Sequence, residues 1–129
     1  MSNYMLYPEN YHELGASFVT QYYHFMQVDR NSVDTFYHPQ ARMTYEGQEI
    51  VGKDKIAEKF RSLPANTIQI VTTSVDVHPC ENSILILVRG QLKCDEDPIL
   101  PFCEMFFLRK FGNCFLISDS MFRLSLHNF

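Results

Sequence analysis

The sequence lacks several features that would place it in a particular class of protein. Its longest apolar runs, such as residues 84–88, are far shorter than the roughly 20 residues that a membrane-spanning helix needs. Lys and Arg are not concentrated anywhere, and the formal net charge of -4 opposes binding to nucleic acid phosphates. Residues 1–8 contain neither the basic nor the long apolar segment of a secretory signal. We therefore expect no membrane or nucleic acid partner and an intracellular location.

The 4 cysteines are not spaced as a zinc site or a disulfide framework. None occurs as Cys-x-x-Cys, and the 5 histidines do not lie beside them at ligand spacing. A chain of 129 residues can bury a core large enough to fold without cross-links. We expect reduced thiols, no metal site and no cofactor. No pairing of a nucleophile with a base is apparent from the spacing either.

What the chain does contain is the composition of one globular domain, residues 1–129. Hydrophobic residues make up 46% of the sequence and aromatic residues 14%, which suffices for a packed core. Charged residues, at 20%, can cover the surface of that core. No linker, repeat or low-complexity segment divides the chain.

The first half of the chain has the apolar periodicity of helices. Large side chains recur every three or four residues between residues 11 and 25, which predicts an amphipathic helix that begins near Pro8 and Asn10. A short helix is predicted at residues 32–37. A hairpin follows, formed by residues 41–45 and a short strand ending at Val51, and a third helix is predicted at residues 53–63.

From Thr67 onward the apolar period changes to two. Four strands are predicted, separated by short turn-forming segments that make them antiparallel neighbours, at residues 68–77, 83–93, 102–111 and 114–126. In the first of these strands the apolar parity slips once, as a β-bulge would produce. The pattern predicts an α+β fold in which a strongly curved antiparallel sheet wraps over the N-terminal helices.

The run Asp95-Glu96-Asp97-Pro98 concentrates negative charge at the end of a predicted strand. Glu46 lies at the tip of the predicted hairpin and would join Asp95 and Asp97 if the two loops meet at one end of the sheet. Three acids around one opening would select a basic partner. The alternative is that all three are solvated turn residues that blunt a sheet edge.

The last strands carry large apolar side chains on both faces. Three helical segments cannot easily cover both faces of a long sheet. This favours a homodimer in which the two sheets pack across a two-fold axis, with Leu87 and Met121 in the interface. The alternative is a core that is covered on both sides within one subunit.

Asp119 is the acid that would serve an enzyme best. It falls within an apolar alternation and is expected to face inward, where a shifted pKa would suit catalysis. The alternative is a structural carboxylate, held by turn amides or answered by Arg123 in the same strand.

Short blocks of residues along nearly the whole chain form an ordered set. They are Tyr22-Tyr23, Tyr45-Glu46-Gly47-Gln48, Gly52-Lys53, Ser62-Leu63-Pro64, Gly90-Gln91-Leu92-Lys93, Asp95-Glu96-Asp97-Pro98-Ile99, Met121-Phe122-Arg123-Leu124 and Leu126-His127-Asn128-Phe129. With these blocks the chain resembles the nuclear transport factor 2 family. The resemblance implies a cone-shaped α+β fold with a hydrophobic cavity, a homodimer, and a carrier that is not an enzyme.

The resemblance also implies partners and site residues. The family's cargo is the small GTPase Ran in its GDP form, which inserts an aromatic side chain into the cavity mouth while basic neighbours pair with acids on the rim. By position, these acids are Glu46, Asp95 and Asp97, with Tyr45 and Phe122 at the mouth. Family dimers also bind the Phe-Gly repeats of nucleoporins weakly, and Tyr11 falls at the repeat-binding aromatic position. The implied location is the cytoplasm and nucleus, concentrated at the nuclear pore.

The chain departs from the family where tryptophan is expected. Tyr11 and Tyr45 occupy two such positions, and the sequence contains no Trp. Each keeps a smaller aromatic ring, so repeat affinity and the fit of the inserted side chain are the properties expected to change. The same cone fold resembles isomerases and dehydratases, and also subunits that heterodimerise with an mRNA-export receptor. Both remain alternatives to the carrier.

Overall fold

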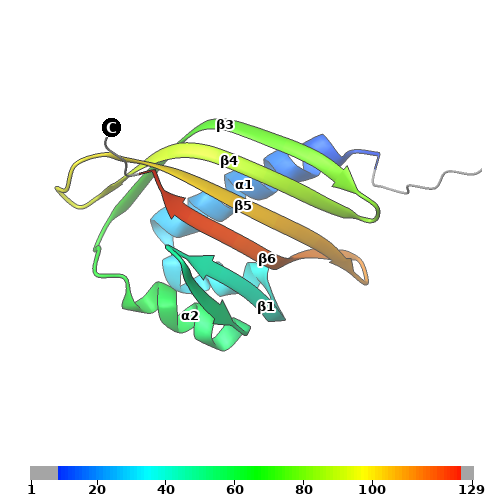
Figure 1. Ribbon diagram of the computed structural model, residues 1–129, viewed down its shortest axis with the longest axis horizontal. Helices are drawn as coiled ribbons and strands as arrows, with labels where there is room; N and C mark the ends of the chain where they lie inside the picture. Colours follow the sequence, from blue (N-terminus) through cyan, green and yellow to red (C-terminus); the bar gives the residue numbers. More distant parts are fainter. Residues whose placement is uncertain (1–8, 126–129) are drawn as a thin grey trace, which may run out of the picture.

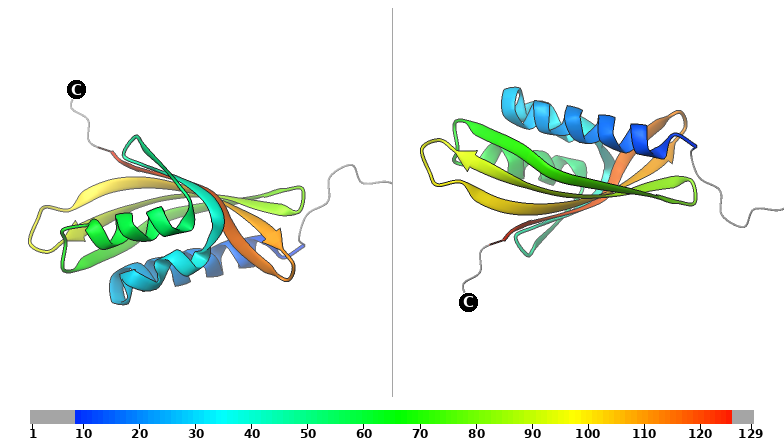
Figure 2. Two further views of the ribbon diagram at one scale, coloured as in Figure 1. Left: turned by 90° about the horizontal axis from the view of Figure 1, so that it is seen from below. Right: turned by 90° about the horizontal axis from the view of Figure 1, so that it is seen from above.

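The computed structural model describes residues 9–125, in which helices cover one face of a six-stranded sheet (Figures 1 and 2). The helical elements of this part of the chain are α1 (Tyr11–Val28), the 3-10 helix η1 (Arg30–Phe36) and α2 (Lys53–Ser62). The strands are β1 (Tyr37–Tyr45), β2 (Gln48–Val51), β3 (Ile68–Cys80), β4 (Ser83–Cys94), β5 (Leu100–Phe111) and β6 (Cys114–Leu124). The predicted α+β class and order of elements are confirmed. The predicted last residue of β6, Leu126, lies outside the described residues.

The strand order in the sheet is β2-β1-β6-β5-β4-β3. β3 to β6 form an antiparallel meander, as their short connections predict. β1, however, runs parallel to β6. The sheet is therefore mixed, whereas the sequence predicts a wholly antiparallel one. The two strands are far apart in the sequence, and no tight turn fixes their relative direction.

α1 packs closely against the sheet through its predicted apolar face. Figure 2 shows the helix lying along one face of the strands. A Cβ atom added to Gly15 would lie 2.7 Å from the side chain of Val77 on β3, so glycine permits this approach. Asn10 caps the helix through its carbonyl group, which accepts a 3.0 Å hydrogen bond from the Leu14 amide, and not through its side chain.

The sheet bends at β3, where the pairing with β4 shifts between Thr72 and Ser74. This irregularity confirms the β-bulge that the slipped apolar parity predicts. Gly90 lies opposite Thr72, and a Cβ atom there would come within 2.4 Å of the Val71 carbonyl oxygen. The bend therefore depends on a residue without a side chain.

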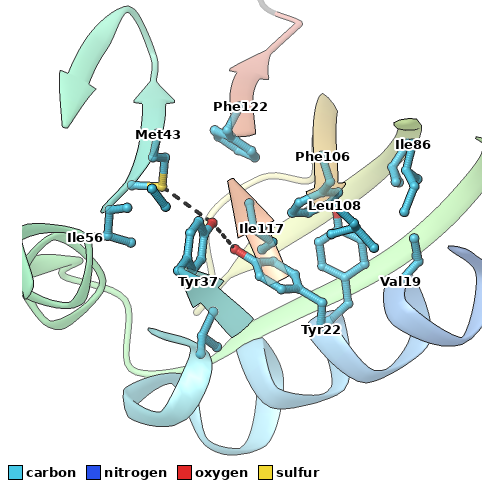
Figure 3. Packing of buried hydrophobic residues seen from close by; sticks show 14 of the residues in the cluster. Val19, Tyr22, Tyr37, Met43, Ile56, Ile86, Phe106, Leu108, Ile117 and Phe122 are labelled. Atoms are coloured by element: carbon cyan, nitrogen blue, oxygen red, sulfur yellow. Dashed lines mark hydrogen bonds between the residues drawn. The ribbon is translucent and has the colours of Figure 1, made fainter. Parts of the chain in front are cut away.

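The core between helices and sheet is rich in aromatic rings and includes a small polar network (Figure 3). The hydroxyl groups of Tyr22 and Tyr37 are 2.9 Å apart, and Tyr37 donates a longer bond to the sulfur of Met43. The Tyr37 hydroxyl also lies 3.3 Å from that of Ser120. The hydroxyl groups of Tyr22, Tyr37 and Ser120 are buried between α1, β1 and β6, and these contacts give them hydrogen-bond partners. No helix in the described part of the chain is long and apolar enough to cross a membrane.

Candidate functional site

An apolar cavity of about 280 Å³ lies between the sheet and the helices. For comparison, an engineered protein cavity of about 150 Å³ holds a benzene ring. Aromatic residues from α1, α2 and three strands form much of the wall, namely Tyr22, Tyr23, Tyr45, Phe60, Phe102 and Phe122. The predicted hydrophobic cavity is therefore present, and it has room for more than one small ring.

Two of the predicted mouth residues, Tyr45 and Phe122, both line the cavity and stack on each other. Their ring centroids are 5.0 Å apart with an interplanar angle of 15°. Phe122 also stacks on Phe102, at 5.6 Å, which continues the apolar wall. The ammonium group of Lys59 lies 4.8 Å from the centre of the Tyr45 ring, so this ring already contacts a cation.

Asp95 lines the cavity, but its carboxylate is engaged within the protein. It accepts hydrogen bonds from the backbone amides of Thr67, at 2.8 Å, and Asn66, at 3.1 Å. These bonds favour the ionised form and hold the pKa of Asp95 below its usual value. Asp95 also has a positive φ of 50°, which is uncommon for a residue with a side chain. Its clearest role is to fasten the end of β4 to the connection between α2 and β3.

Glu46 is tied to β6 and is not itself in the cavity wall. Its carboxylate accepts a short hydrogen bond from the Leu124 amide, and its own amide donates to the Phe122 carbonyl at 3.0 Å. Both of these residues line the cavity, as does its neighbour Tyr45. Glu46 thus lies next to the wall without forming it.

Asp97 differs from the other two acids. It lines the cavity and is exposed, and within residues 9–125 its carboxylate accepts no hydrogen bond and makes no ion pair. Its backbone amide donates to the Cys94 carbonyl at 2.9 Å, which orders the turn. Of the three predicted rim acids, Asp97 is the one whose charge is available to a partner.

Glu104 is a cavity residue that the sequence interpretation missed. It lies on β5, is only 6% exposed, and accepts a 2.8 Å hydrogen bond from the Tyr23 hydroxyl. Burial raises the pKa of Glu104 to about 8, and the hydrogen bond from Tyr23 only partly opposes that rise. The signal was in the sequence, since Glu104 alternates with the buried residues Phe102 and Phe106.

Asp119 faces solvent, so the prediction that it faces inward is wrong. The cause is a β-bulge in β6, where Ile117 pairs with Leu108 and Asp119 with Phe107, leaving Ser118 as the extra residue. The bulge moves Asp119 to the outer face, where it accepts a 3.0 Å hydrogen bond from the Ser118 hydroxyl. Within the described residues it makes no ion pair with Arg123.

The remaining predicted residues lie on other surfaces. Leu87, Met105 and Met121 are directly opposite one another across β4, β5 and β6, on the face away from the helices. Leu87 is 39% exposed and Met121 is 51% exposed. Tyr11, at the start of α1, is half-buried and packs against the core, with its ring centroid 4.3 Å from that of His12.

The chemistry of the described residues gives no metal centre. No group of three or more His, Cys, Asp and Glu residues between positions 9 and 125 is placed to hold an ion. Cys80, Cys94, Cys103 and Cys114 are all unpaired. What the geometry offers is an apolar cavity with acids at its mouth and one in its wall.

Comparison with known proteins identifies the family. Residues 14–124 match the model of the Nuclear transport factor 2 (NTF2) domain. The chain belongs to this family. A Caenorhabditis elegans protein named "Probable nuclear transport factor 2" is 36% identical over 132 residues, which cover 96% of this chain and 99% of the relative. The structure of nuclear transport factor 2 from Cryptosporidium parvum is 31% identical, with a TM-score of 0.90, and the match covers 94% of this chain and 99% of that one.

The names of these relatives support a function in transport between nucleus and cytoplasm. The fold of the nuclear transport factor 2 family also occurs in enzyme-like proteins. A ketosteroid isomerase-like protein from Erwinia carotovora has a TM-score of 0.72 at 16% identity, covering 93% of this chain and all 100% of that one. At that identity the likeness shows a shared fold alone.

Proposed function

We propose that this protein is a homodimeric import carrier for the GDP form of the GTPase Ran, and that it crosses nuclear pores by binding Phe-Gly repeats. The observation that carries the proposal is the juxtaposition, at one cavity mouth, of stacked aromatic rings with an unpaired acid. Tyr45 and Phe122 supply the rings, and Asp97 supplies the charge. Membership of the nuclear transport factor 2 family supports a function in nuclear transport.

The cargo site combines apolar and ionic contacts. An aromatic side chain from the GTPase enters the 280 Å³ cavity and packs against Tyr45 and Phe122. A basic residue beside it pairs with Asp97, which needs no rearrangement to accept it. Asp95 contributes charge to the rim, but it acts mainly by holding the loop that carries Asp97. Glu46 contributes negative charge to the rim through Oε2, since Oε1 accepts the hydrogen bond from the Leu124 amide.

Calorimetry tests this assignment with the GTPase loaded in turn with GDP and with a non-hydrolysable GTP analogue. We expect binding of the GDP form only. Asp97→Lys should weaken it by at least tenfold, since breaking a desolvated charge pair costs roughly 2–5 kcal/mol. Glu96→Lys is the matched control, because Glu96 is its exposed neighbour outside the cavity wall. Equal binding by both variants would remove Asp97 from the site, and no binding of either form would refute the carrier.

The nucleoporin site is proposed at Tyr11. Weak and rapidly reversible contacts suit repeated binding during passage through a pore. Tyr11→Ala should reduce the chemical-shift changes caused by a Phe-Gly peptide, whereas Glu13→Ala, an exposed change in the same turn, should not. A circular dichroism spectrum checks that α1 persists, since Tyr11 packs against the core. Unchanged peptide binding by Tyr11→Ala would place the repeat site elsewhere.

The homodimer is proposed to form through the outer face of the sheet at Leu87 and Met121. The alternative is a subunit that pairs with a different chain, as an mRNA-export adaptor. Solution mass separates the two, because the alternative requires a monomer when the protein is pure.

We favour the carrier over an enzyme because the relatives above 30% identity are named transport factors, and Asp119, the acid first considered for catalysis, is exposed.

A further inference from the structure

The carboxyl group of Glu104 is buried in the cavity wall and is only half satisfied. Its side chain accepts one hydrogen bond within residues 9–125, from the Tyr23 hydroxyl to Oε1. No fully buried side-chain nitrogen or oxygen in that range lacks a partner. Since Oε2 has no partner among the described residues and is not fully buried, it is reached from the cavity that Glu104 lines. A carboxyl oxygen therefore points at the space a ligand would occupy.

No basic residue between positions 9 and 125 lines the cavity beside this group. The described residues that line the cavity include Asp95, Asp97 and Glu104 but no Lys, Arg or His. Arg30 is held by the Ala65 carbonyl at 2.6 Å, and Lys59 lies against Tyr45, and neither lines the cavity. Every charge that the lining can carry is therefore negative.

The titratable neighbours of Glu104 do not change this balance. They are tyrosines from α1 and β1, namely Tyr22, Tyr23, Tyr37 and Tyr45. Burial raises the pKa of each of these hydroxyls, so all four stay neutral at physiological pH. They offer ring faces and hydroxyl groups, and no positive charge.

We propose that the cavity binds a small organic ammonium ion, a protonated amine on an apolar body of about one aromatic ring, with Glu104 as its counter-ion. The aromatic wall suits both parts of such a ligand. Ring faces attract a cation that has been removed from water, and they pack against an apolar body. At 280 Å³ the cavity has room for one ring with a short aminoalkyl chain.

The charge of the ligand couples binding to pH. Burial raises the pKa of Glu104 to about 8, so at neutral pH the group is mostly protonated and must release its proton to pair with an ammonium ion. The affinity for an amine should therefore rise about tenfold for each pH unit between 6 and 7. A neutral ligand of the same shape should show no such dependence.

Calorimetry on the purified full chain tests the proposal with 2-phenylethylamine and its neutral isostere 2-phenylethanol. At pH 7 we expect the amine to bind at least tenfold more tightly. Glu104→Gln keeps the shape and an oxygen that can accept the Tyr23 bond, and it should abolish this preference and the pH dependence. Glu96→Gln, which removes a charge of the same sign from an exposed residue outside the cavity wall, is the control and should retain the preference. Equal affinities for the two probes, no binding of the amine, or an unchanged preference in Glu104→Gln would each overturn the proposal.

A second measurement does not depend on a variant. The carbon-13 chemical shift of the Glu104 carboxyl group reports its ionisation directly. Saturating 2-phenylethylamine at pH 7 should move this shift to the carboxylate position, whereas 2-phenylethanol should leave it at the protonated position. A carboxyl signal that ignores the amine would refute the role of Glu104. Because neither experiment includes the GTPase, the inference stands or fails separately from the carrier function.

Discussion

The hydroxyl group of Tyr23 donates a 2.8 Å hydrogen bond to the carboxyl group of Glu104, and both side chains are buried. The bond joins α1 to β5 across the cavity wall. Burial raises the pKa of both groups, that of Glu104 to about 8. Near neutral pH the contact is therefore mainly a hydrogen bond between two uncharged groups and not an ionic one.

This pair predicts how stability depends on pH. The unfolded chain gives up the Glu104 proton near its ordinary pKa of 4.5, whereas the folded protein keeps it up to about 8. Glu104 thus favours folding fully below pH 4.5, and this contribution is lost as pH rises to 8, at about 1.4 kcal/mol per pH unit between the two pKa values. Glu104→Gln should remove this slope and be the more stable protein at pH 8. Urea unfolding between pH 5 and 8 measures both, and parallel curves for the two proteins would contradict the prediction.

Asp95 predicts a different effect because its pKa is lowered. Its bonds to Thr67 and Asn66 contribute stability above the ordinary carboxyl range, and this contribution is lost as pH falls through the lowered pKa. Asp95→Ala should lower the Tm and speed hydrogen exchange of the Thr67 amide severalfold at neutral pH. Asp97→Ala is the control, since no hydrogen bond of the described residues ends on its carboxylate. If both variants exchange alike, the fastening of this loop does not depend on Asp95.

The next prediction concerns Gly90 on β4, where a side chain would press against β3 and lower the stability of the fold. A Cβ atom there would meet the Val71 carbonyl at 2.4 Å and the ring of Phe102 at 3.0 Å. Because the first contact is with backbone, Gly90→Ala should destabilise the fold by about 1–3 kcal/mol. Gly112→Asn is a matched control at a turn with open space, where asparagine tolerates the positive φ of 63°. Urea unfolding that ranks the control as the less stable variant would show that β3 can move to admit the methyl group.

Local sequence patterns predicted most of the fold, but they did not predict the pairing of strands that are distant in the sequence. The helical stripe of α1 and the parity slip in β3 are both visible in a few consecutive residues. The parallel pairing of β1 with β6 leaves no local trace, because it joins residues 37–45 to residues 114–124. The bulge at Ser118 is also silent in the sequence, and it alone reverses the side to which Asp119 points.

The candidate site was predicted in outline from the acidic loop and the hairpin. The sequence could not reveal that the carboxylates of Asp95 and Glu46 accept hydrogen bonds from backbone amides, whereas that of Asp97 accepts none from the described residues. That distinction depends on turn geometry, which places particular amides against particular oxygens. The alternation of Glu104 with Phe102 and Phe106 indicates an inward-facing side chain. It was not predicted, because charged residues on a strand are generally expected to face water.

The outer face of the sheet gives the last prediction. Leu87, Met105 and Met121 form one cross-strand row, and Leu87 and Met121 are exposed at its ends. If this row is the dimer interface, Met121→Arg should place a cation in an apolar contact and give a monomer in sedimentation velocity. Val28→Arg, an equally drastic change at the exposed end of α1, should leave a particle of twice the 15.1 kDa chain mass. A wild-type monomer, or a Met121→Arg variant that sediments as a dimer, would show that some other contact covers this face.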